Sequence, residues 1–518
     1  MIERILTVGG FTLLSRITGF ARDIFLAAVL GAGPVADAFF VALRLPNHFR
    51  AIFAEGAFNA AFVPAYAGLR ERGGAARAGE FADRIFTLLL ATQIVLLVLA
   101  LAFMPAVIDV LAPGLDGDPV RFPLAIELTR ITFPYLLLIT IVTLYSGILN
   151  ALHRFAAAAA APIFLNLSMI VTLALAAFFP TVGHAAAWGV LIAGVLEVLL
   201  VAYDARRAGV LTGFRKPTLD ADVRAFFKAL GPAVVGSGGV QLALFADTII
   251  ATFLATGALS ALYYADRLNQ LPIGVIGIAA GTVILPEMAR RIAAGDMAGA
   301  SAAQNRAVEF TLLLALPCLA AFLTVPDLIM RALFMRGAFT AADADAAGAT
   351  LAAYAIGLLP FVLIRTATAT FYARGDTATP VKAALTAAVV NIAFKFALMG
   401  PLAQVGLALA TAIGAWINLG LVLWFAKRAG LLAIDARLRG AAIRLVVATI
   451  ILAAVLWVLH APVMQWFAGR PALRDIGPLV MLVVAGGIAY GGALLLLFGP
   501  TRLRNWGRNL GRGRPPTG

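Results

Sequence analysis

The feature that most limits the fold of this chain is a series of fourteen apolar runs, each long enough to cross a lipid bilayer. A helix needs about 20 apolar residues to span the hydrocarbon core. The 518-residue chain is 62% apolar and only 13% charged, which leaves too many apolar side chains for a water-soluble fold. The sequence therefore predicts an all-α polytopic membrane protein with helices near 6–30, 36–66, 83–111, 123–151, 158–179, 185–203, 226–254, 259–286, 307–333, 347–372, 380–399, 403–426, 440–460 and 476–499.

The positions of the basic residues predict how these runs are oriented. An even number of crossings places both termini on the same side of the membrane. With the termini inside, 27 of the 40 Lys and Arg residues fall in inner loops and tails, 5 in outer loops and 8 within the runs. Cytoplasmic loops carry an excess of Lys and Arg, so cytoplasmic termini are predicted. The net charge of +14 thus reflects topology and a basic cytoplasmic tail at 501–518 that faces anionic lipid, and nucleic acid is not an expected partner.

An internal repeat predicts two lobes. The residues Asp23, Gly33, Phe39 and Phe40 are matched 224 residues later by Asp247, Gly257, Tyr263 and Tyr264, and the segment 205–211 recurs as 426–432. Six runs separate the copies, so both copies have one orientation, which is a common plan of transporters with a substrate site between the halves. The predicted parts are a six-helix lobe at 1–215, a second six-helix lobe at 216–430, a last helix pair at 431–500 and the tail at 501–518.

Basic residues within the runs predict a cationic cavity. A charge near the middle of a bilayer is costly and normally faces a cavity or a partner. Four of these residues lie in the first two runs, and Arg267 occupies the repeat-related position in the eighth. The planar guanidinium can bond two phosphate oxygens at once, so an anionic, phosphate-bearing substrate is predicted. The embedded basic residues are Arg16, Arg22, Arg44, Arg50, Arg130, Arg267, Arg365 and Lys395.

Helical spacing leaves two structural alternatives open for these arginines. Arg44 follows Asp37 by seven residues on nearly the same helical face, so an internal pair is as plausible as substrate contact. Arg16 and Arg22 are six residues apart, about 120° on an ideal helix, so one ligand reaches both only in a broad cavity or with a distortion at Gly19.

Asp247 and Lys395 form a separate case. Asp247 lies in the middle of the seventh run, and Lys395 lies in the eleventh, four residues after Asn391. If these two runs are neighbours, the lysine would neutralise the aspartate as an internal ion pair and would occupy the place of a bound cation.

The sequence offers no motif for a cofactor or a metal. Cys318 is the single cysteine, and the four histidines are scattered without ligand spacing. A Gly-rich phosphate loop ending in Lys and Ser or Thr is also missing, which excludes ATP hydrolysis by this chain. A membrane-bound glycosyltransferase or acyltransferase would need acids or histidines in substantial loops, whereas these loops are short and mainly basic. A transporter is therefore favoured over an enzyme.

Several motifs strongly resemble those of the lipid II flippase family MurJ, a branch of the MOP exporter superfamily. The resemblance runs in order from residue 1 to about residue 430, and the last two runs match mainly in number. The motifs that carry it are Gly19-Phe20-Ala21-Arg22-Asp23, Ala36-Asp37-Ala38-Phe39-Phe40, Leu45-Pro46-Asn47, Phe53-Ala54-Glu55-Gly56-Ala57-Phe58 and Tyr263-Tyr264-Ala265-Asp266-Arg267-Leu268.

The resemblance implies a function and a set of site residues. It implies a bacterial inner-membrane protein that moves the undecaprenyl-diphosphate-linked disaccharide-pentapeptide, lipid II, from the inner to the outer leaflet by alternating access. This transport serves peptidoglycan synthesis, cell-wall biogenesis and cell shape, and the last helix pair would form a groove for the lipid tail. The implied substrate-binding residues are Arg16, Arg22, Arg50, Arg267 and Asp37, and the implied gating or structural residues are Glu55, Asn47, Asp23 and Arg44.

The resemblance also bears on partners and on competing functions. Lipid II and membrane lipids are the expected partners, with room for other proteins of cell-wall synthesis, and a monomer is expected. A related exporter of the same superfamily, for another lipid-linked glycan or a drug, is the alternative function. The membrane potential, an ion gradient and consumption of the product outside all stay open as the energy source.

Overall fold

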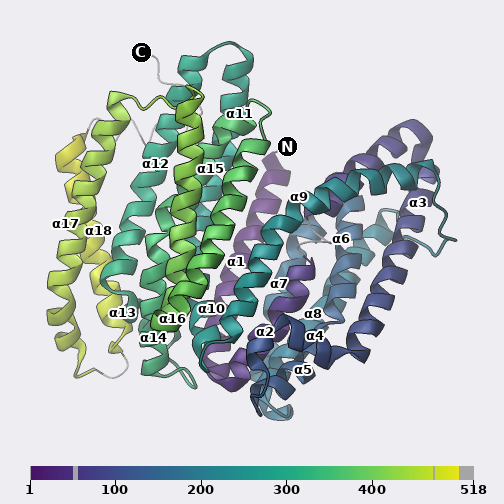
Figure 1. Ribbon diagram of the computed structural model, residues 1–518, viewed down its shortest axis with the longest axis horizontal. Helices are drawn as coiled ribbons and strands as arrows, with labels where there is room; N and C mark the ends of the chain where they lie inside the picture. The colour runs from purple at the N-terminus through teal and green to yellow at the C-terminus, as the bar shows by residue number, and fades with distance from the viewer. Residues whose placement is uncertain (1, 51–55, 471–472, 501–518) are drawn as a thin grey trace. The chain divides into compact units, whose positions relative to one another are not determined.

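The structure, a computed structural model, describes residues 2–50, 56–470 and 473–500, and it consists of helices joined by turns and loops (Figure 1). In the described ranges there is no strand, as expected for a chain whose backbone groups must be satisfied within each membrane segment. The chain forms two compact units. Unit 1 contains residues 1–260 and 336–340, and unit 2 contains residues 261–335 and 341–518.

The helices of unit 1 come first in the chain. They are α1 (Ile2–Leu30), α2 (Pro34–Arg50), α3 (Gly56–Ala102), α4 (Met104–Leu111), α5 (Arg121–Thr132), α6 (Tyr135–Ala151), α7 (Ala156–Ala174), α8 (Val182–Arg207) and α9 (Ala221–Thr252). Short 3-10 turns follow α4 at Pro113–Leu115 and α7 at Ala176–Phe178.

The remaining helices belong to unit 2, except that α10 (Ala258–Pro272) begins in unit 1. A π-helical turn at Ile273–Gly277 follows α10. The other helices are α11 (Ile278–Ala293), α12 (Met297–Thr324), α13 (Pro326–Phe334), α14 (Ala341–Ile356), α15 (Leu358–Tyr372), α16 (Ala378–Arg428), α17 (Ala436–Phe467) and α18 (Ile476–Phe498).

Backbone breaks divide the two longest helices where the sequence separates its apolar runs. Gly74 in α3 has φ 74° and ψ 179°, between the predicted runs 36–66 and 83–111. Ala403 in α16 has φ 47° and ψ −128°, at the junction of the predicted runs 380–399 and 403–426. Nine stretches of the described chain are long and apolar enough to cross a membrane. The chain is a multi-pass membrane protein, and the predicted total of fourteen helices stays a prediction.

The two units do not coincide with the predicted lobes. The helix α9 would open the second lobe, but it packs along α3 and belongs to unit 1. The lobes at 1–215 and 216–430 rest on the sequence repeat and stay a prediction. The predicted tail at 501–518 lies outside the described residues.

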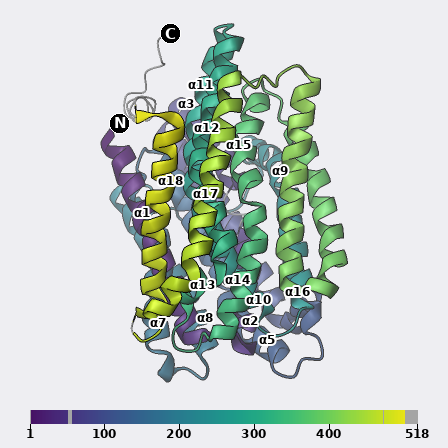
Figure 2. The same cartoon turned by 90° about the vertical axis from the view of Figure 1, so that its left-hand side faces the viewer.

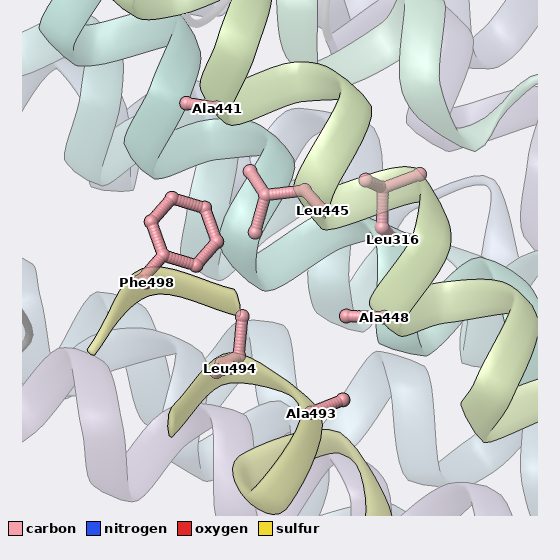
Figure 3. Packing of buried hydrophobic residues seen from close by; sticks show 7 residues of the cluster. All are labelled: Leu316, Ala441, Leu445, Ala448, Ala493, Leu494 and Phe498. Atoms are coloured by element: carbon pink, nitrogen blue, oxygen red, sulfur yellow. The ribbon is translucent and has the colours of Figure 1, made fainter. Parts of the chain in front are cut away.

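The last two helices pack as a pair against α12 within unit 2 (Figure 2). A buried cluster joins the three helices through Leu316 of α12, Leu445 of α17 and Phe498 of α18 (Figure 3). Small residues in the same cluster, such as Ala448, let the helix axes approach closely, which is typical of packing between membrane helices. The opposite faces of the pair are apolar and exposed, as expected of surfaces that contact lipid.

The start of α17 is also fixed to α12 by charge. The Arg306 guanidinium of α12 pairs with Glu309 and with Asp435, and Asp435 accepts a hydrogen bond from the Leu438 N–H at 2.6 Å as the N-cap of α17. Glu309 is only 3% exposed, so its charge is compensated inside the protein. The helix pair is thereby attached to unit 2 by both apolar packing and ion pairs.

Candidate functional site

Arg22 is the most enclosed of the predicted cavity arginines whose side chains are described. It lies on α1 and is 6% exposed. Its Nε and Nη2 donate to Asp23 Oδ1 at 3.1 and 2.7 Å, and its Nη1 donates to Asn166 Oδ1 of α7 at 3.0 Å. A buried guanidinium needs such partners because an uncompensated charge in a low-dielectric interior is very costly. The adjacent Arg22 and Asp23 of the sequence motif therefore form one neutralised cluster with Asn166.

Asn166 connects this cluster to the backbone of α1. Its Nδ2 donates to the Ser15 carbonyl at 3.0 Å and to Thr18 Oγ1 at 3.1 Å. Asn166 packs directly over Gly19, where a Cβ would lie 3.4 Å from Asn166 Nδ2, about ordinary van der Waals contact. The sequence raised a distortion at Gly19 as one way to bring Arg16 and Arg22 together. Instead α1 continues as a helix through Gly19, and Arg16 is exposed on it.

Asp37 of α2 forms the centre of a second buried cluster. The side chain is fully buried, and its Oδ2 accepts from the Gly257 N–H at 2.8 Å. Its Oδ1 accepts from the Ser260 N–H at 3.1 Å and from Ser260 Oγ at 2.8 Å. Gly257 has φ +90°, a left-handed conformation that favours glycine. Asp37 therefore holds the turn at the start of α10 in place, and both of its oxygens are occupied in this conformation.

Arg121 supports the same cluster from the start of α5. Its Nη1 lies 3.7 Å from Asp37 Oδ2 and donates to the Leu254 carbonyl at 3.3 Å. Its Nε donates to Asp118 Oδ2 at 2.6 Å. Hydrogen bonds from the Arg121 N–H and side chain lower the pKa of Asp118 to about 2. Asp37 thus has Arg121 as its ion-pair partner, and the described residues do not form the pair with Arg44 that helical spacing allowed.

Within the described part of the chain, the other predicted site residues belong to neither the Arg22 cluster nor the Asp37 cluster. Arg267 is exposed on α10, with its guanidinium 5.0 Å from the centre of the Tyr263 ring. Asn47 donates to the Leu43 carbonyl at 2.9 Å within α2, and Arg44 is half-buried. The Arg50 side chain and Glu55 lie outside the described residues. The assignment of these residues to substrate binding or gating stays a prediction.

The predicted pair of Asp247 and Lys395 also stays a prediction. Asp247 belongs to unit 1, whereas Lys395 belongs to unit 2. Lys395 is 2% exposed, so its ammonium group is enclosed by the helices around it.

Three site residues were not predicted from the sequence, namely Arg121, Asn166 and Ser260. Asn166 had a detectable signal, since it is an amide within an otherwise apolar run. The sequence placed Arg121 in an outer loop, but it is only 8% exposed and contacts Asp37 of α2 and the Leu254 carbonyl. Ser260 has no signal that distinguishes it from other serines near helix starts.

Apolar helices that carry buried arginine and aspartate clusters define a multi-pass membrane protein, and two solved structures of membrane transporters share its fold. The structure titled "Lipid II flippase MurJ, inward closed conformation" superposes with a TM-score of 0.80 at 22% identity, covering 95% of this chain and 98% of that one. An inward-facing multidrug resistance MATE family transporter of the MOP superfamily gives 0.64 at 17% identity, covering 82% and 98%.

Sequence comparison narrows the class to one family. The family model described as "Lipid II flippase MurJ" matches residues 26–474. A probable lipid II flippase MurJ of Rhizobium meliloti (strain 1021) is 42% identical over 463 residues, which cover 88% of this chain and 86% of the relative. The lipid II flippase MurJ of Burkholderia cenocepacia is 35% identical, covering 81% and 82%. The chain belongs to the MurJ family, which confirms the resemblance of its motifs.

Proposed function

We propose that this chain is a lipid II flippase, which moves the undecaprenyl-diphosphate-linked disaccharide-pentapeptide from the inner to the outer leaflet of the bacterial inner membrane. The observation that carries this proposal is the match to the MurJ family over residues 26–474. Both termini are cytoplasmic in this proposal, in keeping with the 27 basic residues in inner segments and 5 in outer loops. Transport serves peptidoglycan synthesis, and no bond is broken in the process.

In this proposal, the Arg22 guanidinium binds the diphosphate of the substrate. Asp23 and Asn166 hold the guanidinium in this conformation, so a diphosphate competes with them for the N–H groups. Exchange of one oxyanion partner for another keeps the arginine neutralised throughout, which avoids the cost of an uncompensated buried charge. Arg16, which is exposed on the same helix, makes the first contact, and Arg50 and Arg267 complete the predicted anion site.

In the proposed alternating access, the Asp37 cluster stabilises one of the two states. Its bonds to Gly257 and Ser260 stabilise the turn before α10 in the conformation described here. Contact between Asp37 and the substrate, or between Asp37 and the cavity arginines after release, belongs to a state in which these bonds have opened. The lobes predicted at 1–215 and 216–430 would rock between the two states, and the lipid tail would follow the last helix pair.

The proposed function is tested by depleting the protein in its host and labelling lipid II in each leaflet separately. Depletion should leave lipid II in the inner leaflet and reduce it in the outer one. Unchanged outer-leaflet lipid II, in a strain without another flippase, would refute the proposal. Accumulation of a different lipid-linked glycan would indicate the related exporter instead.

The cationic site is tested by replacing single arginines in the same host. Arg22→Ala should reduce outer-leaflet labelling by about tenfold or more, because a charge-assisted bidentate contact to phosphate is lost. Arg130→Ala is the matched control, since Arg130 is also an arginine within an apolar run but is exposed on α5. Equal transport by the Arg22→Ala variant and the wild type would remove the cationic mechanism.

A further inference from the structure

A cavity in unit 2 has no part in the proposed translocation. It is an open cavity of about 310 Å³, and it lies where the C-terminal ends of α15 and α16 meet the start of α16. Its lining combines two arginines with apolar and small polar side chains, namely Arg374, Arg428, Phe371, Phe425, Asp376 and Thr379. The surrounding loops belong to the basic set that the sequence assigns to the cytoplasmic side.

The two arginines of this cavity have no carboxylate partner within the described chain. Arg374 donates from Nη1 to the Thr370 carbonyl at 2.7 Å and from Nη2 to Met297 Sδ at 3.9 Å, so the other three of its five N–H groups have no hydrogen-bond partner among the described residues. The Arg428 guanidinium lies 5.5 Å from the centre of the Trp424 ring, and its side chain is exposed. Both arginines therefore line the cavity, and neither has an ion pair with an acid in the described part of the chain.

The single acid in the lining is engaged elsewhere. Asp376 accepts from the Thr379 N–H at 3.0 Å and from Thr379 Oγ1 at 2.6 Å, so its carboxylate caps the start of α16. A carboxylate directed at a helix N-terminus is stabilised there by the helix dipole. Asp376 is thus held by the helix start rather than by either arginine.

The first copy of the repeat has an ion pair at the corresponding positions. At an offset of 221, Tyr203 and Arg207 correspond to Trp424 and Arg428, and Arg207 also lies over its aromatic ring, at 5.9 Å. Asp204 of the same helix pairs with Arg154 in the turn between α6 and α7. At the same offset Phe425 replaces this Asp204.

The turns of the two copies also correspond. The Arg154 N–H donates to the Leu149 carbonyl at 2.8 Å, and the Asp376 N–H donates to the Phe371 carbonyl at 3.0 Å, each across five residues. The second copy therefore has Asp376 and Phe425 where the first has an arginine and an aspartate. These two side chains cannot form the ion pair that Arg154 and Asp204 form in the first copy.

We propose that this cavity binds the phosphate group of an anionic phospholipid headgroup, through Arg374 and Arg428. Guanidinium groups bond phosphate oxygens in a bidentate manner, and basic pockets between membrane helices are suited to anionic headgroups. Phe371 and Phe425 provide an apolar wall for the glycerol and the upper acyl chains. Trp424 is 50% exposed beside the cavity, as is typical of tryptophan at a membrane surface. This site does not depend on the proposed transport function.

The proposal is tested by titrating the detergent-solubilised full chain with dioleoylphosphatidylglycerol and counting bound lipids by native mass spectrometry. The double variant Arg374→Gln/Arg428→Gln should bind the first lipid about tenfold more weakly, because two charge-assisted contacts are lost. Arg207→Gln is the matched control in the first repeat and should bind like the wild type. Equal affinity of the double variant and the wild type would overturn the proposal.

Two further binding experiments test whether the site prefers an anionic lipid over a zwitterionic lipid and over free phosphate. Dioleoylphosphatidylcholine should bind weakly, because its choline cancels the phosphate charge. Millimolar inorganic phosphate should compete only weakly with the lipid, and full displacement would overturn the lipid assignment in favour of a free phosphate site.

A second test of the site leaves both arginines in place and changes Phe425 instead. Phe425→Asp restores the acid of the first repeat, so it should neutralise the cavity and lower the affinity about as much as the double variant, while Phe425→Leu should not. The single Arg428→Gln variant changes an exposed side chain, so it provides a folded comparison. Unchanged lipid affinity in both Phe425→Asp and Arg428→Gln would contradict the proposal even if the double variant does not fold.

Discussion

The Nη1 of Arg22 on α1 donates a 3.0 Å hydrogen bond to Oδ1 of Asn166 on α7, two residues that are 144 positions apart in the chain. Asn166 donates in turn to the Ser15 carbonyl of α1. The amide therefore orients the guanidinium and ties the two helices together. Asn166 is a positioning residue for Arg22 in the proposed transport.

The first prediction concerns Asn166. Asn166→Ala should lower transport several-fold and reduce the free energy of unfolding by about 1–3 kcal/mol, because buried polar partners lose their hydrogen bonds. Asn166→Asp should also lower transport, because a second carboxylate competes with the substrate for Arg22. It should lose stability as well, because the Nδ2 bonds to Ser15 and Thr18 are removed. Leaflet-specific lipid II labelling and thermal unfolding in detergent measure the two effects. Full transport by Asn166→Asp would argue against competition for the guanidinium.

The second prediction concerns Asp37. Asp37→Asn places an amide where two oxygens now accept three hydrogen bonds, so at least one N–H of the turn before α10 meets another donor. We expect a loss of about 2 kcal/mol or more in the stability of the described conformation, since a buried donor is left without an acceptor.

Ser260→Ala is a milder substitution in the same cluster and serves as the comparison for Asp37→Asn. It removes only the Oγ bond and should cost about 1 kcal/mol, with transport largely kept. Thermal unfolding in detergent and labelling of lipid II in cells measure both variants. If the two variants behaved alike, the two backbone bonds of Asp37 would have little energetic importance.

The third prediction concerns a carbonyl that a proline leaves without its helical donor. Pro46 in α2 has no N–H for the Ala42 carbonyl, and Thr132 Oγ1 of α5 donates to that oxygen at 2.8 Å instead. Thr132→Val should cost about 1–3 kcal/mol, because a buried acceptor becomes unsatisfied.

A double-mutant cycle tests this assignment. In a Pro46→Ala background, the new N–H can bond the Ala42 carbonyl, so Thr132→Val should cost much less than in the wild type. Additive costs of the two substitutions, measured by thermal unfolding, would show that Thr132 does not compensate for the proline.

The fourth prediction concerns pH. The pKa of Asp118 is lowered from 3.8 to about 2 by hydrogen bonds from Arg121. A carboxyl with a lowered pKa stabilises the folded state above its unfolded pKa and loses that contribution as pH falls through the folded pKa. The stability difference between the wild type and Asp118→Asn should therefore be constant near neutral pH and decrease between about pH 4 and pH 2. A difference that persists unchanged at pH 2 would contradict the Asp118–Arg121 pair.

The candidate site was predictable from the sequence where a charge stood out in an apolar run. Arg22 and Asp23 are detectable in this way, because an ionised side chain in a membrane segment implies a partner or a cavity. Their partner Asn166 was not assigned, since the bond depends on α1 and α7 lying side by side. The enclosure of Asp37 was equally hidden, because Gly257 and Ser260 follow it by more than two hundred residues.

The sequence by itself determined the all-α membrane fold, the predicted orientation and the family, because the length of apolar runs, the location of basic residues and local motifs are properties of the chain alone. Only the tertiary structure decided which embedded charges are neutralised, and by what. It assigned Arg22 to Asp23 and Asn166, and Asp37 to Arg121 and the turn before α10. The physical reason is that a hydrogen bond requires contact within about 3 Å, and contacts between distant segments arise only when the helices pack.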